Sequence, residues 1–352
     1  MHIFAPASNP NVSVQLTKLL GGYEFAEGLH VHRSPSCPYF PLTRFPSLLK
    51  ILSAAGSEAD VLISEFHPFH CAGFEGIITK ALTKKPLILD VHDIAASQAT
   101  LFQLYKKNEN FCYNACDGLV VCSDEAKEYA NEITKKEIHV VPNGVNFKSY
   151  ANVKKEETQK LRKDLGLEDS LVIGFSGSLT KQNGLEYLIR AMPYVLKEVN
   201  DVKLLIVGGG AEEQRLRSMV KELGIESKVV FTGGVSYEKV PTYLSVMDIC
   251  TAPFPRGNEF KTNFPLKLVE YMACGKPIVV TEGPVLRRIV TSSKSGIVVD
   301  SEDEVSLANG ITRLLSSDSL RKQLGEKGRH YAAGFDWDIL ADKMYSFIKR
   351  FG

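Results

Sequence analysis

The chain has 352 residues, the length of about two α/β domains. Its 42 lysine and arginine residues nearly balance its 41 aspartate and glutamate residues, so the composition excludes a strongly basic protein that coats nucleic acid. With 44% hydrophobic and 24% charged residues, the chain lies within the globular range and outside the disordered and fibrous ones.

No segment approaches the ~18 consecutive apolar residues of a membrane-spanning helix, and the start of the chain, Met1–Pro6, is too short for a signal peptide. We therefore expect a cytoplasmic protein. The seven cysteines are scattered, and only Cys112 and Cys116 lie close together. We interpret the cysteines as reduced thiols and expect no metal site.

The first 150 residues alternate short apolar runs with helical patterns, which predicts βαβ units and a parallel sheet. The expected strands are His2–Ala5, Leu29–His32, Val61–Ser64, Pro86–Val91, Gly118–Cys122 and Ile138–Pro142.

A second series of strands follows the charged connector Val153–Asp169. Apolar residues recur every three or four positions from Leu185 to Val199, which predicts a helix that buries one stripe. The expected strands are Leu171–Phe175, Val202–Val207, Lys228–Phe231, Asp248–Ala252, Pro277–Val280 and Gly296–Val299.

These patterns predict two doubly wound, Rossmann-like α/β domains over residues 1–150 and 151–335. A last helix, over about residues 336–352, is expected to pack back on the first domain. Open parallel sheets bind ligands beyond the carboxyl ends of their strands, so we expect the two domains to face each other across a cleft.

Two glycine-rich turns follow strands of the second domain. Gly174–Leu179 leads into Asn183-Gly184 and a helix, which suits either a phosphate site or an ordinary tight turn. The second turn, Gly208-Gly209-Gly210, lacks the third glycine of a dinucleotide fingerprint because Glu213 stands there. This excludes an NAD site and favours a plain turn.

Proline and glycine delimit a helix of about ten residues within Phe264–Pro277. Glu270 lies beside the apolar stripe of this helix, where a carboxylate requires hydrogen-bond donors, and sugar hydroxyls would supply them. The alternative is a surface ion pair between Lys267 and Glu270.

Together, four segments resemble the retaining glycosyltransferases of the group one family, which have the GT-B fold of two Rossmann-like domains. They are GFSGSL at Gly174–Leu179, FTGGV at Phe231–Val235, the helix at Phe264–Pro277, and LGEKGR at Leu324–Arg329 with FDWD at Phe335–Asp338. The resemblance implies that the second domain holds a nucleoside-diphosphate sugar and the first binds the acceptor. It also implies transfer with retention of configuration and without a metal ion.

In this family one helix carries two glutamates separated by seven residues, of which the second contacts the donor ribose and the first the donor sugar. Glu270 matches the second, whereas Thr262 stands in the place of the first. Phe264 and Leu266 match positions where backbone N–H groups face the pyrophosphate.

The family also places an arginine and a lysine on the pyrophosphate, and Ser178 and Asn183 occupy those positions here. We expect Lys181 and Lys267 to replace them, ahead of Arg256 and Lys261. The donor site implied by the resemblance comprises Gly177, Ser178, Lys181, Asn183, Gly208, Val235, Thr262, Asn263, Phe264, Pro265, Leu266, Lys267 and Glu270.

Seven of the eight histidines lie in the first 150 residues. His92 ends a strand and resembles the family's histidine that faces the donor sugar and the acceptor. An imidazole can bind a hydroxyl or accept a proton near pH 7, so we expect His92 to be the catalytic residue. His67 and His70 are better explained as solvated loop residues.

The resemblance therefore implies a hexosyl- or N-acetylhexosaminyl-transferase for polysaccharide, glycolipid or glycoconjugate synthesis, with a nucleotide sugar as substrate and no cofactor. A sugar, lipid-linked or other hydroxyl acceptor is expected, with peripheral contact to a membrane face if it is lipid-linked, and no nucleic acid. Two alternatives stay open: a sugar-nucleotide epimerase of the same fold, which needs no acceptor, and a non-enzymatic two-domain sugar-binding protein.

Overall fold

The computed structural model describes all residues except 1, 7–29, 35–59, 67–71, 93–101 and 258–263. The chain forms two compact units. One holds Met1–Asn143, Lys261–Phe264 and Trp337–Gly352, and the other holds Gly144–Phe260 and Pro265–Asp336. In the described ranges, no helix combines the length and the apolar character that crossing a bilayer requires.

All twelve expected strands are present, with small shifts at their ends. In the first unit, β3 (Leu62–Phe66), β4 (Leu87–Val91), β5 (Gly118–Val121) and β6 (Glu137–Val140) form a parallel sheet in that order. The strands β1 (His2–Pro6) and β2 (His30–Ser34) form a separate parallel pair, with β1 beside β3.

Alternating side chains of β4 fill two cores on opposite faces of this sheet. Leu87 and Leu89 pack into a core shared with the helices α4 (Phe102–Ala115) and α5 (Asp124–Ile133), while α3 (Ala72–Thr83) contacts β3 and β4. Ile88 points the other way, into a core shared with α15 (Trp337–Ile348). This alternation is the period of two of a β-strand, and it leaves β4 buried on both faces.

The end of the chain is held against β5 and β6. Gly118 makes room for it, because a Cβ atom there would lie 2.7 Å from the ring of Phe351 and 3.1 Å from that of Phe347. Arg350 forms an ion pair with Glu137 of β6. The C-terminal helix therefore belongs to the first unit, whose boundary in the middle of the chain falls between Asn143 and Gly144.

The second unit contains a six-stranded parallel sheet with the order β12-β11-β10-β7-β8-β9. Its strands are β7 (Leu171–Ser176), β8 (Val202–Val207), β9 (Val229–Phe231), β10 (Ile249–Ala252), β11 (Ile278–Thr281) and β12 (Gly296–Val299). This is the Rossmann order, which reverses direction between β7 and β10, and ligands bind such sheets at that point. The prediction of a doubly wound α/β architecture is confirmed for this unit.

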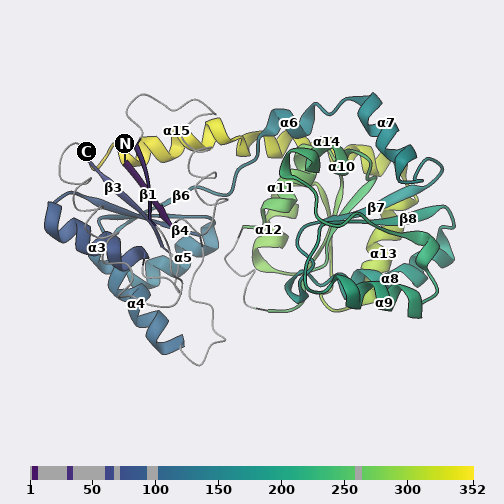
Figure 1. Ribbon diagram of the computed structural model, residues 1–352, viewed down its shortest axis with the longest axis horizontal. Coiled ribbons are helices and arrows are strands. Elements are labelled where there is room, and N and C mark those ends of the chain that lie inside the picture. Colours follow the sequence, from purple (N-terminus) through teal and green to yellow (C-terminus); the bar gives the residue numbers. More distant parts are fainter. Residues whose placement is uncertain (1, 7–29, 35–59, 67–71, 93–101, 258–263) are drawn as a thin grey trace. The chain divides into compact units, whose positions relative to one another are not determined.

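Helices cover both faces of this sheet (Figure 1). The main core lies under α8, α9 and α13, and α11 packs against α14. The helices are α6 (Phe147–Ala151), α7 (Lys155–Asp164), α8 (Leu185–Glu198), α9 (Glu213–Glu222), α10 (Val240–Ser245), α11 (Leu266–Ala273), α12 (Pro284–Ser293), α13 (Glu304–Leu315) and α14 (Asp318–Ala332), with 3-10 turns η2 (Lys181–Asn183), η3 (Glu226–Lys228), η4 (Tyr237–Lys239) and η5 (Ala333–Phe335).

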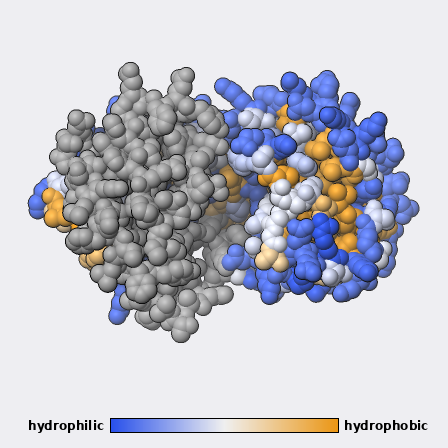
Figure 2. All heavy atoms as spheres, in the orientation of Figure 1, coloured by the Kyte–Doolittle hydropathy of each residue, from blue (hydrophilic) through white to orange (hydrophobic). Residues whose placement is uncertain are grey.

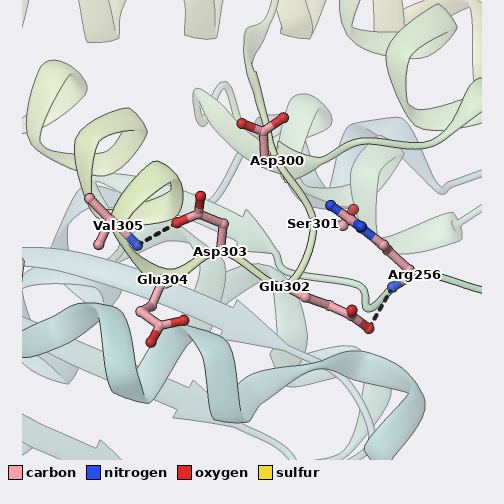
Figure 3. A pocket seen from close by; sticks show the side chains of 7 residues that line it. All are labelled: Arg256, Asp300, Ser301, Glu302, Asp303, Glu304 and Val305. Atoms are coloured by element: carbon pink, nitrogen blue, oxygen red, sulfur yellow. Dashed lines mark hydrogen bonds between the residues drawn. The ribbon is translucent and has the colours of Figure 1, made fainter.

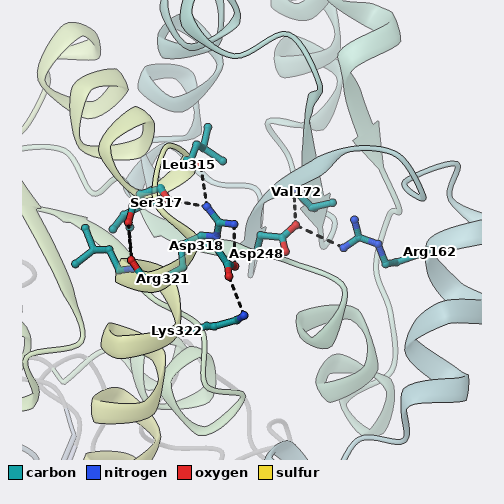
Figure 4. A network of polar contacts seen from close by, with 11 residues as sticks. Arg162, Val172, Asp248, Leu315, Ser317, Asp318, Arg321 and Lys322 are labelled. Atoms are coloured by element: carbon teal, nitrogen blue, oxygen red, sulfur yellow. Dashed lines mark hydrogen bonds and ion pairs between the residues drawn. The ribbon is translucent and has the colours of Figure 1, made fainter.

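Polar contacts join the charged helix α7 to the amino-terminal ends of β7 and β10. The guanidinium of Arg162 donates to the carbonyl oxygens of Val246 (2.8 Å) and Ser170 (2.6 Å). It also faces Asp248, whose carboxylate accepts the backbone N–H of Val172 at 2.8 Å (Figure 4). The visible surface of the second unit mixes hydrophilic residues with apolar ones, as is usual for a folded domain (Figure 2).

Candidate active site

A glycine turn lies where the second sheet reverses its strand order. Gly177 follows β7 with φ of +148°, a conformation that favours glycine, and its N–H donates to the carbonyl of Val207 at 3.0 Å. A Cβ atom on Gly177 would lie 3.0 Å from the amine of Lys267. The backbone of this turn therefore passes directly beside a lysine head group.

Lys267, in the first turn of α11, lies at this reversal point. Its Nζ is 4.4 Å from the ring centroid of Phe175, in β7, and 5.0 Å from that of Phe254, just after β10. It donates a hydrogen bond of 2.6 Å to Oδ1 of Asn183. Among the described residues, no carboxylate lies within ion-pair distance of this amine. Burial lowers the pKa of Lys267 to about 7, and nearby Glu270 partly opposes that shift.

Asn183 occupies the family's lysine position, but its amide is buried, with 8% of the residue exposed. Nδ2 donates to the carbonyl of Ser178 at 2.8 Å and also lies 3.2 Å from the hydroxyls of Ser178 and Thr180. These acceptors fix which end of the amide is the NH₂ group, so Oδ1 is the atom that faces Lys267. Asn183 thus connects the glycine turn to α11.

Glu270 lies one turn after Lys267 and is buried, with 7% of the residue exposed. The hydroxyl of Tyr150, in α6, donates to its Oε1 at 2.8 Å, and the hydroxyl of Tyr237 is a second donor. Burial raises the pKa of Glu270, while the two tyrosines and Lys267 act in the opposite direction. The alternative of a surface ion pair is therefore wrong. The carboxylate already accepts hydrogen bonds from two tyrosines of the protein, beside any sugar hydroxyls that the sequence analysis expects.

The second glycine turn is explained by the protein's own backbone. A Cβ atom on Gly208, whose φ is +136°, would lie 1.9 Å from the carbonyl oxygen of Gly177. One on Gly210 would lie 2.4 Å from the carbonyl oxygen of Leu179. The two turns therefore pack together, and Gly208 also donates its N–H to Gly233 at 3.0 Å, two residues before half-buried Val235. This agrees with the interpretation of a plain turn.

The other predicted donor-site residues differ in their exposure. Ser178 and Lys181 are exposed, and Lys181 makes no side-chain hydrogen bond or ion pair to a described residue. Pro265 is the residue before α11, and Leu266 is the first residue of that helix. Phe264 is buried, and its carbonyl accepts a hydrogen bond of 2.8 Å from Asn143 in the first unit. Thr262, Asn263 and Lys261 lie outside the described residues.

An acidic pocket follows β10 and β12 (Figure 3). Its lining contains Arg256 together with the consecutive segment 300–305, which carries the carboxylates of Asp300, Glu302, Asp303 and Glu304. Glu302 accepts the backbone N–H of Arg256 at 3.1 Å, and Asp303 caps α13 through the N–H groups of Val305 and Ser306. Four carboxylates repel a diphosphate, so Arg256 is a poorer phosphate ligand than Lys267.

In the first unit, His92 directly follows β4, at the carboxyl end of the sheet where α/β folds bind ligands. Its Nε2 lies 3.2 Å from Oδ2 of Asp90, a buried carboxylate in β4. This contact orients the imidazole. His67 and His70 lie outside the described residues.

Two family models match nearly the whole chain. Residues 157–331 match "Glycosyl transferases group 1", and residues 1–149 match "Glycosyltransferase Family 4". The chain belongs to the group 1 glycosyltransferases. The prediction of the family is confirmed, and the enzyme is a glycosyltransferase, which excludes a non-enzymatic binding protein and weighs against the epimerase.

Two relatives indicate the range of the family. A D-inositol 3-phosphate glycosyltransferase of Corynebacterium jeikeium is 27% identical over 323 residues, which cover 86% of this chain and 75% of that protein. A GDP-mannose-dependent alpha-(1-6)-phosphatidylinositol monomannoside mannosyltransferase of Mycolicibacterium smegmatis is 31% identical over 175 residues, 49% of this chain and 46% of that protein.

A solved structure confirms the GT-B fold. The structure of HepE from Anabaena, in complex with UDP, superposes with a TM-score of 0.84 at 19% sequence identity, covering 99% of each chain. At this level of identity the likeness concerns the fold, and the roles of individual residues rest on the site described above.

Four aromatic residues of this glycosyltransferase's site were not predicted from the sequence, and one of them is Tyr237, the second donor to Glu270. Tyr150 reaches Glu270 from a helix 120 positions earlier, and no spacing rule connects the two. Phe175 and Phe254 flank the amine of Lys267 from the ends of two strands. Phe175 belongs to an apolar run that indicates a core strand, and Phe254 lies between two prolines just after another such run. Nothing in these runs marks the residue that reaches a ligand site.

Proposed function

We propose that this glycosyltransferase moves a hexosyl or N-acetylhexosaminyl group from a nucleoside-diphosphate sugar to an acceptor hydroxyl, with retention of configuration. The observation that carries the proposal is the amine of Lys267 at the reversal point between β7 and β10, beside the Gly177 turn. A cation at this place, with no carboxylate partner among the described residues, suits an anionic ligand.

In this proposal, the diphosphate is bound from three directions. The ammonium of Lys267 contacts it from α11, and the first N–H groups of that helix, from Leu266 onward, add their dipoles. The main chain of the Gly177 turn can approach the diphosphate closely because glycine has no side chain. Lys181 adds an exposed cation from η2. Donors already in place stabilise the charge that develops on the leaving diphosphate, which is the main contribution that the protein makes to such a transfer.

Glu270 is proposed to accept hydrogen bonds from the ribose hydroxyls, beside the tyrosines that already hold it. Val235 and the Gly208 turn, at the ends of β9 and β8, would border the base. His92 is proposed to contact the reacting sugar or the acceptor, in an orientation set by Asp90.

The relatives suggest the classes of donor and acceptor. One is GDP-mannose-dependent and acts on a phosphatidylinositol monomannoside, and a structural neighbour binds UDP. A sugar or lipid-linked acceptor is therefore proposed, used at the cytoplasmic face of a membrane. Transfer is proposed to need no metal ion, so a chelator should leave it unchanged.

The test is a calorimetric binding screen with UDP, GDP, ADP and their sugars, followed by a transfer assay with the donor that binds. Lys267→Ala should lower diphosphate affinity, while Lys221→Ala, which removes an exposed lysine of α9, should not. If the folded wild type binds no nucleoside diphosphate, the proposal is wrong. Donor turnover that is independent of any acceptor would instead favour the epimerase.

A further inference from the structure

We propose that Asn183 is a positioning residue for diphosphate binding, which holds the amine of Lys267 over the Gly177 turn in its protonated form. The proposal rests on the proposed function, since it concerns the same diphosphate site. It assigns a role to a position at which the family's lysine is missing.

The geometry gives Asn183 two separate tasks. Its Nδ2 binds the glycine turn through the carbonyl of Ser178 at 2.8 Å, and its Oδ1 accepts from Lys267 Nζ at 2.6 Å. One rigid amide therefore sets the distance between the turn and the lysine on α11. The side chain of lysine has four rotatable bonds, so without this acceptor its amine has many other positions available.

Asn183 is also the polar partner that favours the ammonium over the neutral amine. The groups that face the amine from β7 and from the segment after β10 are the rings of Phe175 and Phe254. Glu270, on the same helix, is the titratable group among the described residues that acts on it electrostatically, and it also favours the charged form. Burial is the larger effect, outweighs Glu270 and lowers the pKa of Lys267 to about 7. The charge of this lysine therefore depends on each acceptor near it.

The pH dependence of binding separates this role from a purely structural one. The probe is whichever of UDP, GDP and ADP binds the wild type most tightly, titrated between pH 5.5 and 9. The dissociation constant of each variant is divided by that of the wild type at the same pH, which cancels the ionisation of the probe itself. The wild type should lose affinity above about pH 7, where free Lys267 loses its proton.

Two substitutions of Asn183 should shift this pH dependence in opposite directions. N183A removes the acceptor, which lowers the pKa of Lys267, so the loss of affinity should begin about one pH unit lower and the ratio should rise roughly fivefold between pH 6 and pH 8. N183D places an anion on the amine and raises the pKa of Lys267, so its loss should begin at higher pH. Both variants lose the Nδ2 contacts to the turn in whole or in part.

A structural role alone would raise the dissociation constants of N183A and N183D by a constant factor at every pH. That result would overturn the proposal. N183A and N183D both disturb the turn, but N183A lacks an acceptor for the amine of Lys267 and N183D has an anionic one, so only an effect of the acceptor separates their pH dependences. K267R is the matched control, since a guanidinium stays charged throughout this range and its affinity should lack the loss above pH 7.

The outcome also separates this proposal from the function on which it rests. If the wild type binds a diphosphate and K267A weakens binding, but N183A and N183D leave the pH dependence unchanged, only the role of Asn183 is wrong. If the folded wild type binds none of the three diphosphates, both proposals fail. Melting temperatures measured in the same buffers show that each variant is folded during the titration.

Discussion

Replacing Glu270 by alanine should remove the ribose contact of the donor site. A hydrogen bond to a charged group contributes about 1.5–3 kcal/mol, so E270A should weaken nucleoside-diphosphate binding by roughly ten- to a hundredfold. The loss of affinity should depend on the ribose hydroxyls of the ligand and not on its phosphates, because Lys267 and the Gly177 turn are unchanged.

The assay is a cycle of two proteins and two ligands, measured by calorimetry. Wild type and E270A are each titrated with a nucleoside diphosphate and with its 2′-deoxy and 3′-deoxy forms. The wild type should discriminate against at least one deoxy form by about 1.5–3 kcal/mol, and E270A should not. Equal discrimination by both proteins would refute the assignment of Glu270 to the ribose.

Stability must be controlled in the same experiment, since the buried hydroxyl of Tyr150 donates to Glu270. E270A leaves this hydroxyl without its acceptor, at a cost of about 1–3 kcal/mol of unfolding free energy. The double variant E270A/Y150F removes both partners of the Tyr150–Glu270 hydrogen bond, leaves Tyr237 in place, and should recover part of that loss while still failing to bind the ribose. Thermal denaturation of the three proteins separates loss of folding from loss of binding.

Three further expectations follow from the described contacts. The double variant K181A/K267A should lose affinity for a nucleoside diphosphate by about 1.5–3 kcal/mol per contact in calorimetry, and equal losses for the bare nucleoside would place the charges elsewhere. H92A should lower the rate of transfer by about 10²–10⁴-fold in a steady-state assay with unchanged diphosphate affinity, and full activity would leave the first unit without a catalytic residue. D303A removes the cap of α13 and should lower the unfolding free energy by about 0.5–2 kcal/mol in a denaturant titration, whereas no change would show that water replaces the cap.

Sequence patterns predicted the strands well because buried parallel strands are short apolar runs between turn residues, and this signal is local. The same local reasoning predicted that Glu270 needs hydrogen-bond donors, since a carboxylate beside an apolar stripe is costly without them. It could not predict that Tyr150 is one of those donors, because the fold brings together two helices that are distant in the sequence.

The direction of the Asn183 amide was equally beyond prediction. From the sequence, Asn183 is expected in the donor site, at the position of a phosphate-binding lysine. In the structure the side chain is buried and holds the turn and Lys267, because the backbone of η2 brings it next to Ser178 and Thr180. Likewise, the alternation of strands and helices predicted parallel sheets but did not reveal that β1 and β2 pair apart from β3–β6.

The position of α15 on the first unit has a consequence for the order in which the enzyme folds during synthesis. Ile88 and Val120 pack in one buried apolar cluster with Trp337, Leu340, Met344 and Phe347 of α15. Domains generally fold as they leave the ribosome, from the N-terminus onward. Here the first unit lacks α15 until the second has been made, so Ile88 and Val120 lack their partners on that helix during that interval. The enzyme should therefore depend more on chaperones when translation is slow, and a nascent chain halted before Trp337 should aggregate through its first half.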